Sequence, residues 1–180
     1  MPENTTSSKK PISGTGKITK MKIHLRAVKE SDRDAVISIF NYYVIHGYAA
    51  YPDQPVSDTF FAYLRHGTFS FYVIESAAGV VGFGFTKPFL PFPVFSTTFS
   101  LTYFIMPEYS HHGLGTRLLH RLLSDAKDLG LNMAVANMSS RNDASVQFHT
   151  KHGFEEAGRL HRVGIKFGEP FDVIWMQKAI

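Results

Sequence analysis

Apolar residues recur with two different periods along this chain, and each period predicts a kind of element. From residue 21 to residue 27 they alternate with polar residues, which is typical of a strand. From Gly115 to Leu129 they return about every 3.6 residues, and Gly130 follows where a helix usually ends. The same patterns predict helices over residues 31–43, 58–66 and 144–152, and strands over residues 69–75, 80–86, 97–106, 131–138, 154–162 and 171–177.

The order of these elements predicts an α/β fold in one domain, residues 21–180. One strand and two helices come first, three strands follow, and helix, strand, helix and two strands complete the chain. This order is typical of a mixed sheet with helices on its faces. We expect Ser31 or Asp32 to cap the first helix and Asn142 the last. The Pro- and Phe-rich residues 88–95 are expected to form a loop, because proline cannot join a central ladder.

Composition narrows the function classes. The chain has no cysteine, which excludes disulfides, thiolate metal sites and a cysteine nucleophile. No apolar run reaches the roughly 18 residues of a membrane helix. The N-terminus also lacks the apolar core of a secretion signal. We therefore expect a cytoplasmic protein that acts without a membrane.

The net charge of +4 is concentrated at one end of the chain. Residues 1–20 hold four lysines against one glutamate and are rich in Ser, Thr and Gly, so they cannot bury a core. We expect a disordered basic tail and no nucleic-acid partner. The alternative is a nucleic-acid-binding protein, whose binding would be lost when residues 1–20 are deleted.

The most informative stretch, residues 103–116, combines a strand, a turn with two glycines and the start of a long helix. The first turn of a helix has free backbone N–H groups and a positive dipole end, and glycine lets a phosphate approach closely. Such a turn can bind a diphosphate. Gly113 and Gly115 alone are also typical of a turn that binds nothing. A nucleotide P-loop is excluded because Thr116-Arg117 follows the second glycine, and a dinucleotide fingerprint because a third glycine is missing.

Residues downstream of the turn add to this signal. Asn142-Asp143-Ala144-Ser145, then His149, then Gly153-Phe154 follow one strand and one helix later. In this order they resemble the GNAT superfamily of acyl-CoA-dependent N-acetyltransferases over residues 21–180. The ending Gly164–Val173 is similar to the phosphinothricin acetyltransferase-like branch. The resemblance implies a twisted, mostly antiparallel sheet of about seven strands with helices on both faces, and a homodimer.

The resemblance also implies a reaction. Acetyl-CoA is the cosubstrate, no metal is needed, and the neutral primary amine of a small molecule attacks the thioester directly. A backbone N–H at Ile105 would stabilise the oxyanion, although Ile105 can equally be a core residue because only its backbone is used. Asn142 would bond the cofactor arm. Pantetheine would lie along Phe104, Ile105 and Met106, and the diphosphate on His111, His112, Gly113, Leu114, Gly115 and Thr116.

Proton transfer sets a further requirement. An alkyl ammonium with a pKa near 10 is about 0.1% neutral at pH 7, so a base or a water relay must remove a proton. His149 stands where many family members carry a tyrosine acid near the sulfur, and a histidine can donate or relay a proton. It can equally be a helix histidine that bonds a backbone carbonyl. His149 and His152 lack the carboxylate or cysteine partner that a metal site needs.

Three positions depart from the family pattern. Ser110 stands where the turn usually starts with Gln or Arg. Ser100 stands where this branch usually carries a Glu proposed as the general base. Leu90 stands where the branch often has a basic residue for a substrate carboxylate, which puts an amino-acid-analogue substrate in question. Lys87 is a candidate for that role, although no sequence pattern assigns it.

The acceptor side is expected among aromatic residues. One hypothesis is an unusually apolar acceptor pocket that favours hydrophobic or aromatic amines. The alternative is a loop that packs under its own phenylalanines or against a second subunit. Weaker acceptor-side candidates are Tyr48, Tyr51 and Asp53. The phenylalanines in question are Phe89, Phe92, Phe95 and Phe99.

Two other functions remain open. The absent Glu favours a non-catalytic acyl-CoA-binding module, which thiol release with any amine would exclude. A protein N-terminal or lysine acetyltransferase needs an open groove, which the Pro- and Phe-rich segment disfavours.

Overall fold

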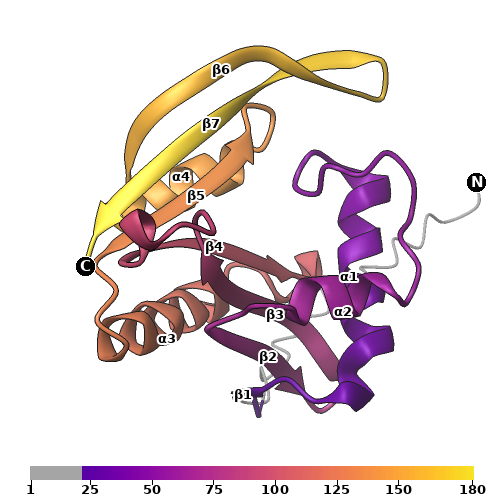
Figure 1. Cartoon of the computed structure of the whole chain (residues 1–180). Coiled ribbons are helices and arrows are strands. Elements are labelled where there is room, and N and C mark those ends of the chain that lie inside the picture. Colours follow the sequence, from indigo (N-terminus) through magenta and orange to yellow (C-terminus); the bar gives the residue numbers. More distant parts are fainter. Residues whose placement is uncertain (1–21) are drawn as a thin grey trace, which may run out of the picture.

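The computed structural model describes residues 22–180, and the predicted tail lies outside these residues. One seven-stranded sheet carries α-helices on both faces (Figure 1). The strands are β1 (His24–Ala27), β2 (Ser70–Ser76), β3 (Gly79–Pro88), β4 (Thr98–Ile105), β5 (Met133–Ser139), β6 (Glu155–Lys166) and β7 (Glu169–Ala179). The helices are α1 (Arg33–His46), α2 (Phe60–Arg65), α3 (Leu114–Asp128) and α4 (Asp143–Lys151).

The strands lie in the order β1-β2-β3-β4-β5-β7-β6. Every neighbouring pair is antiparallel except β4 and β5, which are parallel. The predicted α/β class and the mostly antiparallel sheet of about seven strands are therefore confirmed. In the parallel pair in the middle of the sheet, the two strands stop pairing partway along their length.

Each face of the sheet has its own apolar core. On one face the buried side of α3, with Leu118 and Leu122 at 0% exposure, packs over β2, β3 and β4. On the other face Phe40 of α1 packs against Phe83 and Phe104 of the sheet. The sheet thus separates a layer of α3 and α4 from a layer of α1 and α2.

Some predicted ends differ from the structure. β3 runs through Pro88, which pairs with Phe99, because a missing N–H is tolerated at the end of a strand. The β6–β7 hairpin is longer than predicted and turns at Phe167 and Gly168, which have φ of 53° and 78°. Because nearly all of β6 is exposed, its side chains show no alternation that predicts its end.

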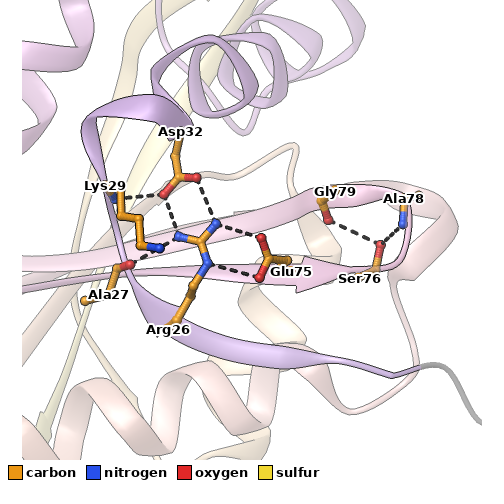
Figure 2. A network of polar contacts seen from close by, with 8 residues as sticks. All are labelled: Arg26, Ala27, Lys29, Asp32, Glu75, Ser76, Ala78 and Gly79. Carbon is orange, nitrogen blue, oxygen red and sulfur yellow. Dashed lines mark hydrogen bonds and ion pairs between the residues drawn. The ribbon is translucent and has the colours of Figure 1, made fainter.

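A polar network ties the first strand to the start of α1 (Figure 2). The Arg26 guanidinium donates to both carboxylate oxygens of Asp32, at 2.7 and 2.9 Å, and to both of Glu75, at 2.8 and 3.1 Å. Asp32 also accepts from the Lys29 N–H at 2.8 Å. The carboxylate therefore does not cap α1 as predicted, because Arg26 and Lys29 take it up. The Arg26 guanidinium lowers the pKa of Asp32 below its usual value.

None of the helices in residues 22–180 has the length and apolar character needed to cross a membrane.

Candidate active site

The sheet opens between its two parallel strands. β4 and β5 pair only from Thr98–Met133 to Ser100–Val135. Beyond that level β4 continues to Ile105 bonded to β3, and β5 continues to Ser139 bonded to β7. Within residues 22–180, no strand pairs with residues 101–105 on the side of β5. The two strands therefore leave free backbone edges facing each other.

A cavity of about 370 Å³ occupies this opening and passes from one face of the sheet to the other. Its walls come from both helical layers, so two reactants can meet in it from opposite sides. Residues on the α3–α4 side include Tyr103, Asn142, Ser145 and His149, and those on the α1–α2 side include Phe40, Phe60, Tyr63, Phe85 and Lys87.

The backbone of Ile105 faces the opening. The next residue, Met106, donates its N–H to the Val81 carbonyl of β3 at 2.9 Å. Because successive residues of a strand point their backbone groups to opposite sides, the N–H and C=O of Ile105 point away from β3. The Ile105 carbonyl accepts a hydrogen bond from the Tyr43 hydroxyl of α1. Its N–H is left without a strand partner at the edge of the opening.

The predicted phosphate turn follows β4 directly and ends at α3. His111 and Gly113 have φ of 63° and 74°, so the chain reverses through two left-handed residues. His111, His112 and Gly113 are exposed, and Leu114 is buried. No side chain caps the first turn of α3, which leaves its backbone N–H groups open to an anion.

Two contacts hold the first turn of α3 against α4. A Cβ at Gly115 would meet the Phe148 ring at 3.2 Å, so glycine permits the close approach. His152 Nδ1 lies 2.8 Å from the Phe148 carbonyl and therefore carries the proton. His152 Nε2 is then the acceptor for the Thr116 hydroxyl, 3.0 Å away. The turn is thereby placed at the same end of β4 as the opening.

Asn142 stands at the start of α4 and lines the cavity. Its side-chain oxygen accepts from the Ser145 N–H at 3.3 Å, so the predicted helix cap is confirmed. Because the oxygen is used in the cap, the NH₂ group is the part of the side chain that is left for a ligand.

His149 is buried, with 3% exposure, and both ring nitrogens have partners. Nδ1 lies 2.7 Å from the Ser145 carbonyl, which can only accept, so Nδ1 carries the proton. Nε2 therefore accepts from the Tyr103 hydroxyl, 2.7 Å away. Burial lowers the pKa of His149 and raises that of Tyr103. The expected bond to a backbone carbonyl is confirmed, and Tyr103 is a partner that the sequence did not reveal.

Lys87 and Ser100 lie on the acceptor side, at the closed end of the opening. The Lys87 ammonium donates to the Tyr63 carbonyl at 2.8 Å and lies 4.8 Å from the Tyr63 ring centre and 5.3 Å from that of Phe85. Burial lowers the pKa of Lys87. Leu90 is 40% exposed and is not among the residues that line the cavity.

The hypothesis of an acceptor pocket built by the predicted phenylalanines is wrong, and the alternative, a loop that packs on its own phenylalanines, is the arrangement found. Phe89 packs against Phe95 and Trp175, with ring centres 5.9 and 6.1 Å apart. Phe92 is 60% exposed, and Phe99 lies in the core under α3. The loop lies past the end of β3, so it packs on itself and on β7 instead of entering the opening. The cavity is nevertheless aromatic, through Phe40, Phe60, Tyr63 and Phe85.

The loop after α1 covers the acceptor side. The Tyr51 hydroxyl donates to the side-chain oxygen of Asn137 on β5 at 2.8 Å, and burial raises the pKa of Tyr51 to about 12. The buried Lys166 ammonium donates to the Ala50 carbonyl at 2.7 Å. Tyr48 packs on Phe167 and Phe171 of the β6–β7 hairpin. Of the three loop candidates, only Tyr51 lines the cavity.

Comparisons with known proteins agree with this geometry. The Acetyltransferase (GNAT) domain family matches residues 22–155. The chain is 31% identical to the L-amino acid N-acyltransferase of Escherichia coli, over 85% of this chain and 91% of that protein. It is 27% identical to the phosphinothricin N-acetyltransferase of Alcaligenes faecalis, over 87% of this chain and 82% of that protein.

A solved structure adds the cofactor. The acetyltransferase of Salmonella typhimurium, determined with its cofactor acetyl-CoA, has a TM-score of 0.79 and is 28% identical, over 87% of this chain and 93% of that one. The predicted resemblance is thus confirmed, and the chain belongs to the GNAT acetyltransferase family.

Proposed function

We propose that this protein transfers an acetyl group from acetyl-CoA to the primary amine of a small amino-acid-like molecule. The observation that carries the proposal is the opening between β4 and β5, whose cavity connects the two faces of the sheet. A thioester held from the α3–α4 side can meet an amine held from the α1–α2 side, which is the arrangement that direct attack requires.

The donor side fits coenzyme A. The uncapped first turn of α3, from Leu114 to Thr116, offers backbone N–H groups to the diphosphate, and the exposed His111 and His112 lie beside it. The free edge of Phe104, Ile105 and Met106 runs along the path of the pantetheine arm, where the NH₂ group of Asn142 can donate. The comparison with the Salmonella protein, which holds acetyl-CoA, supports this assignment.

The Ile105 N–H is proposed to bind the oxyanion. It belongs to the part of β4 that has separated from β5, and the Tyr43 hydroxyl fixes the carbonyl of the same residue. A donor of this kind typically contributes roughly 3–4 kcal/mol to the transition state. Because a backbone group does the work, the side chain at this position is free to pack in the core.

The acceptor side fits an amino acid with an apolar side chain. Of residues 22–180, Lys87 alone brings a cationic side chain to the cavity wall, and its ammonium keeps donors beyond the one given to Tyr63. A substrate carboxylate can pair with it. The rings of Phe40, Phe60 and Phe85 supply an apolar wall for the rest of the molecule. The Escherichia coli relative is named an L-amino acid N-acyltransferase, and this name supports the same class of acceptor.

The alternative functions fit less well. A protein chain needs an open groove, but Tyr51 bridges to Asn137 over the acceptor side. A binding module needs no cavity through the sheet and no proton-transfer groups near the sulfur, yet Tyr103 and His149 line the cavity. A nucleic-acid role rests on residues 1–20, outside the described part of the chain.

We also propose that residues 21–180 act as one catalytic domain of a cytoplasmic homodimer. Support for a dimer comes from the edge strand β6, which exposes Leu160, Val163 and Ile165 by 51, 57 and 74%. An exposed apolar edge strand is a surface that proteins usually cover.

Thiol release from acetyl-CoA tests the function. The enzyme is incubated with a panel of L-amino acids, their decarboxylated amines and an N-terminal peptide, and free coenzyme A is measured. Amine-dependent release that is fastest with apolar L-amino acids supports the proposal. Binding of acetyl-CoA without release for any amine would establish the binding module, and release with the peptide alone a protein acetyltransferase.

A further inference from the structure

No carboxylate of residues 22–180 lines the cavity. Among the residues of the described chain that line it, the titratable ones are Lys87, His149 and the tyrosines Tyr51, Tyr63 and Tyr103. Ser100 only approaches the Lys87 carbonyl, at 3.4 Å, and cannot act as a base alone. Burial raises the pKa of Tyr51 and Tyr103, which makes them weaker acids, and Lys87 is an acceptor only when it has lost its proton. Among these groups, the imidazole of His149 is already a proton acceptor at physiological pH, because burial lowers its pKa.

His149 does not face the cavity alone. The imidazole is 3% exposed, whereas Tyr103 is half-buried and lies between β4 and α4. The two rings stack with centres 5.6 Å apart, and the phenol proton points at Nε2. Nδ1 is committed to the Ser145 carbonyl at 2.7 Å. A proton can therefore reach or leave Nε2 through the Tyr103 oxygen.

We propose that Tyr103 and His149 act as one proton carrier, which takes the proton that the attacking amine loses and returns it to the leaving thiolate. The inference rests on the proposed function and assigns the missing base of that reaction. In this proposal the Tyr103 oxygen exchanges protons with the reacting atoms, which makes Tyr103 a catalytic residue, and His149 holds the proton behind it.

The protons balance in two steps. After attack by the neutral amine, the tetrahedral intermediate carries an ammonium nitrogen and an oxyanion. The ammonium gives a proton to the Tyr103 oxygen while the Tyr103 proton moves to Nε2, which forms an imidazolium. When the carbon–sulfur bond breaks, the Tyr103 proton passes to the sulfur while the Nε2 proton returns to the Tyr103 oxygen. Amide and thiol leave, and the pair is back in its starting state.

The surroundings of the pair favour a neutral imidazole that can accept a proton. Phe148 and Phe154 lie edge-on to His149, with ring centres 5.8 and 5.0 Å away. Besides Tyr103, a neighbouring titratable group is His152 at the C-terminal end of α4, whose carbonyl accepts from the Lys178 ammonium of β7 at 2.6 Å. Burial and the neighbouring His152 lower the pKa of His149, so the ring is neutral at physiological pH.

A double-mutant cycle tests the carrier in the full-length enzyme. We expect Tyr103→Phe and His149→Gln each to lower kcat by about 100-fold or more, the usual contribution of acid–base catalysis. Because the two act as a unit, the double variant should lose no more than the worse single variant. The KM for acetyl-CoA should stay within about threefold in all three. Tyr72→Phe is the matched control, because its hydroxyl bonds Asp125 of α3, away from the cavity, at 2.6 Å.

The outcomes separate a catalytic role from a structural one. With saturating amine, kcat of the wild type should fall on acidification as His149 takes a proton, and both single variants should lose this acid limb. Tyr103→Phe with kcat within about threefold of the wild type would overturn the proposal, as would double-variant losses that multiply. An acid limb that persists in both variants would overturn it as well.

Nitrogen-15 NMR of the imidazole provides a readout without turnover. The wild type should show His149 as the Nδ1–H tautomer with a slowly exchanging phenol proton bonded to Nε2, and Tyr103→Phe should lose that proton. Failure to see this bond would overturn the carrier even in an active enzyme. Conversely, the protein could show the Tyr103–His149 hydrogen bond and yet transfer no acetyl group to any amine. That result would overturn the proposed function, and the proton carrier with it.

Discussion

Lys87 on β3 lies directly opposite Ser100 on β4, at the last level where β4 still pairs with β5. The ammonium and the hydroxyl both border the cavity at this closed end of the opening. A small neutral group therefore stands next to a cation at this end of the cavity. The pair suits the binding of an anionic substrate group better than the removal of a proton.

Replacing Lys87 should weaken acceptors that carry a carboxylate. Hydrogen bonds to charged groups contribute about 1.5–3 kcal/mol, so Lys87→Met should raise the KM for an L-amino acid roughly 10- to 100-fold. The corresponding decarboxylated amine should be affected by less than about threefold. Steady-state kinetics with both acceptors measures the difference. Lys127→Met, in the last turn of α3, is the control, and equal losses for both acceptors would contradict a carboxylate role.

Substitutions at two glycines, one at each end of α3, distinguish an effect on cofactor binding from an effect of backbone strain. Gly113 and Gly130 have φ of 74° and 76°, and neither has a neighbour within 4 Å of an added Cβ. Alanine at either position should cost about 1–2 kcal/mol of stability, because both residues are left-handed. Only Gly113→Ala should also raise the dissociation constant for coenzyme A, by about tenfold, because it disturbs the phosphate turn.

Urea unfolding and calorimetric titration measure the two effects separately. Equal coenzyme A affinity in both variants would place the diphosphate elsewhere on the protein.

The Arg26–Asp32 pair should make the free energy of unfolding depend on pH in the acidic range. The pKa of Asp32 is lower in the folded chain than the value of about 3.9 expected in the unfolded one. Its contribution is therefore complete above that value and is lost as pH falls through the folded pKa. Asp32→Asn should lower the free energy of unfolding at pH 7 by about 2 kcal/mol and flatten its decline below pH 4.

An exposed aspartate provides the comparison. The Asp34 carboxylate is 79% exposed in its ion pair with Arg33, so Asp34→Asn should change the free energy of unfolding by less than about 0.5 kcal/mol. Urea unfolding measures the loss of unfolding free energy in both variants. Similar losses would show that the Arg26 network stabilises the fold no more than an exposed ion pair does.

The exposed strand β6 predicts the behaviour of the protein in solution. Light scattering should give the mass of a dimer at micromolar concentration, and Ile165→Glu should raise the dimer dissociation constant about tenfold or more, because a charge opposes apolar burial. Leu129→Glu alters a side chain of similar exposure at the end of α3 and should leave the mass unchanged. A wild type that is monomeric at these concentrations would contradict the homodimer.

Local patterns predicted the parts of the site that are built locally. The phosphate turn, the long helix α3 and the Asn142 cap depend on residues a few positions apart, and the structure has them within one or two residues of the expected ends. The opening between β4 and β5 is found only in the structure, because no local pattern indicates where the pairing of two strands stops.

Contacts between distant residues were not predictable. Tyr103 and His149 are 46 positions apart, and only the packing of α4 on β4 brings the phenol to Nε2. The hypothesis of an apolar acceptor pocket places its wall in the loop that contains Phe89, whereas the alternative has this loop pack on its own phenylalanines. In the fold, the wall is built by Phe40, Phe60 and Phe85 from α1, α2 and β3.

A crystal structure with bound coenzyme A tests the central claim most directly, that the opening between β4 and β5 is where the thioester meets the amine. The diphosphate should lie on the N–H groups of residues 114–116, the pantetheine along residues 104–106, and the sulfur within about 4 Å of the Tyr103 hydroxyl. A coenzyme A molecule bound outside the opening, or one whose sulfur lies away from Tyr103 and His149, would contradict it.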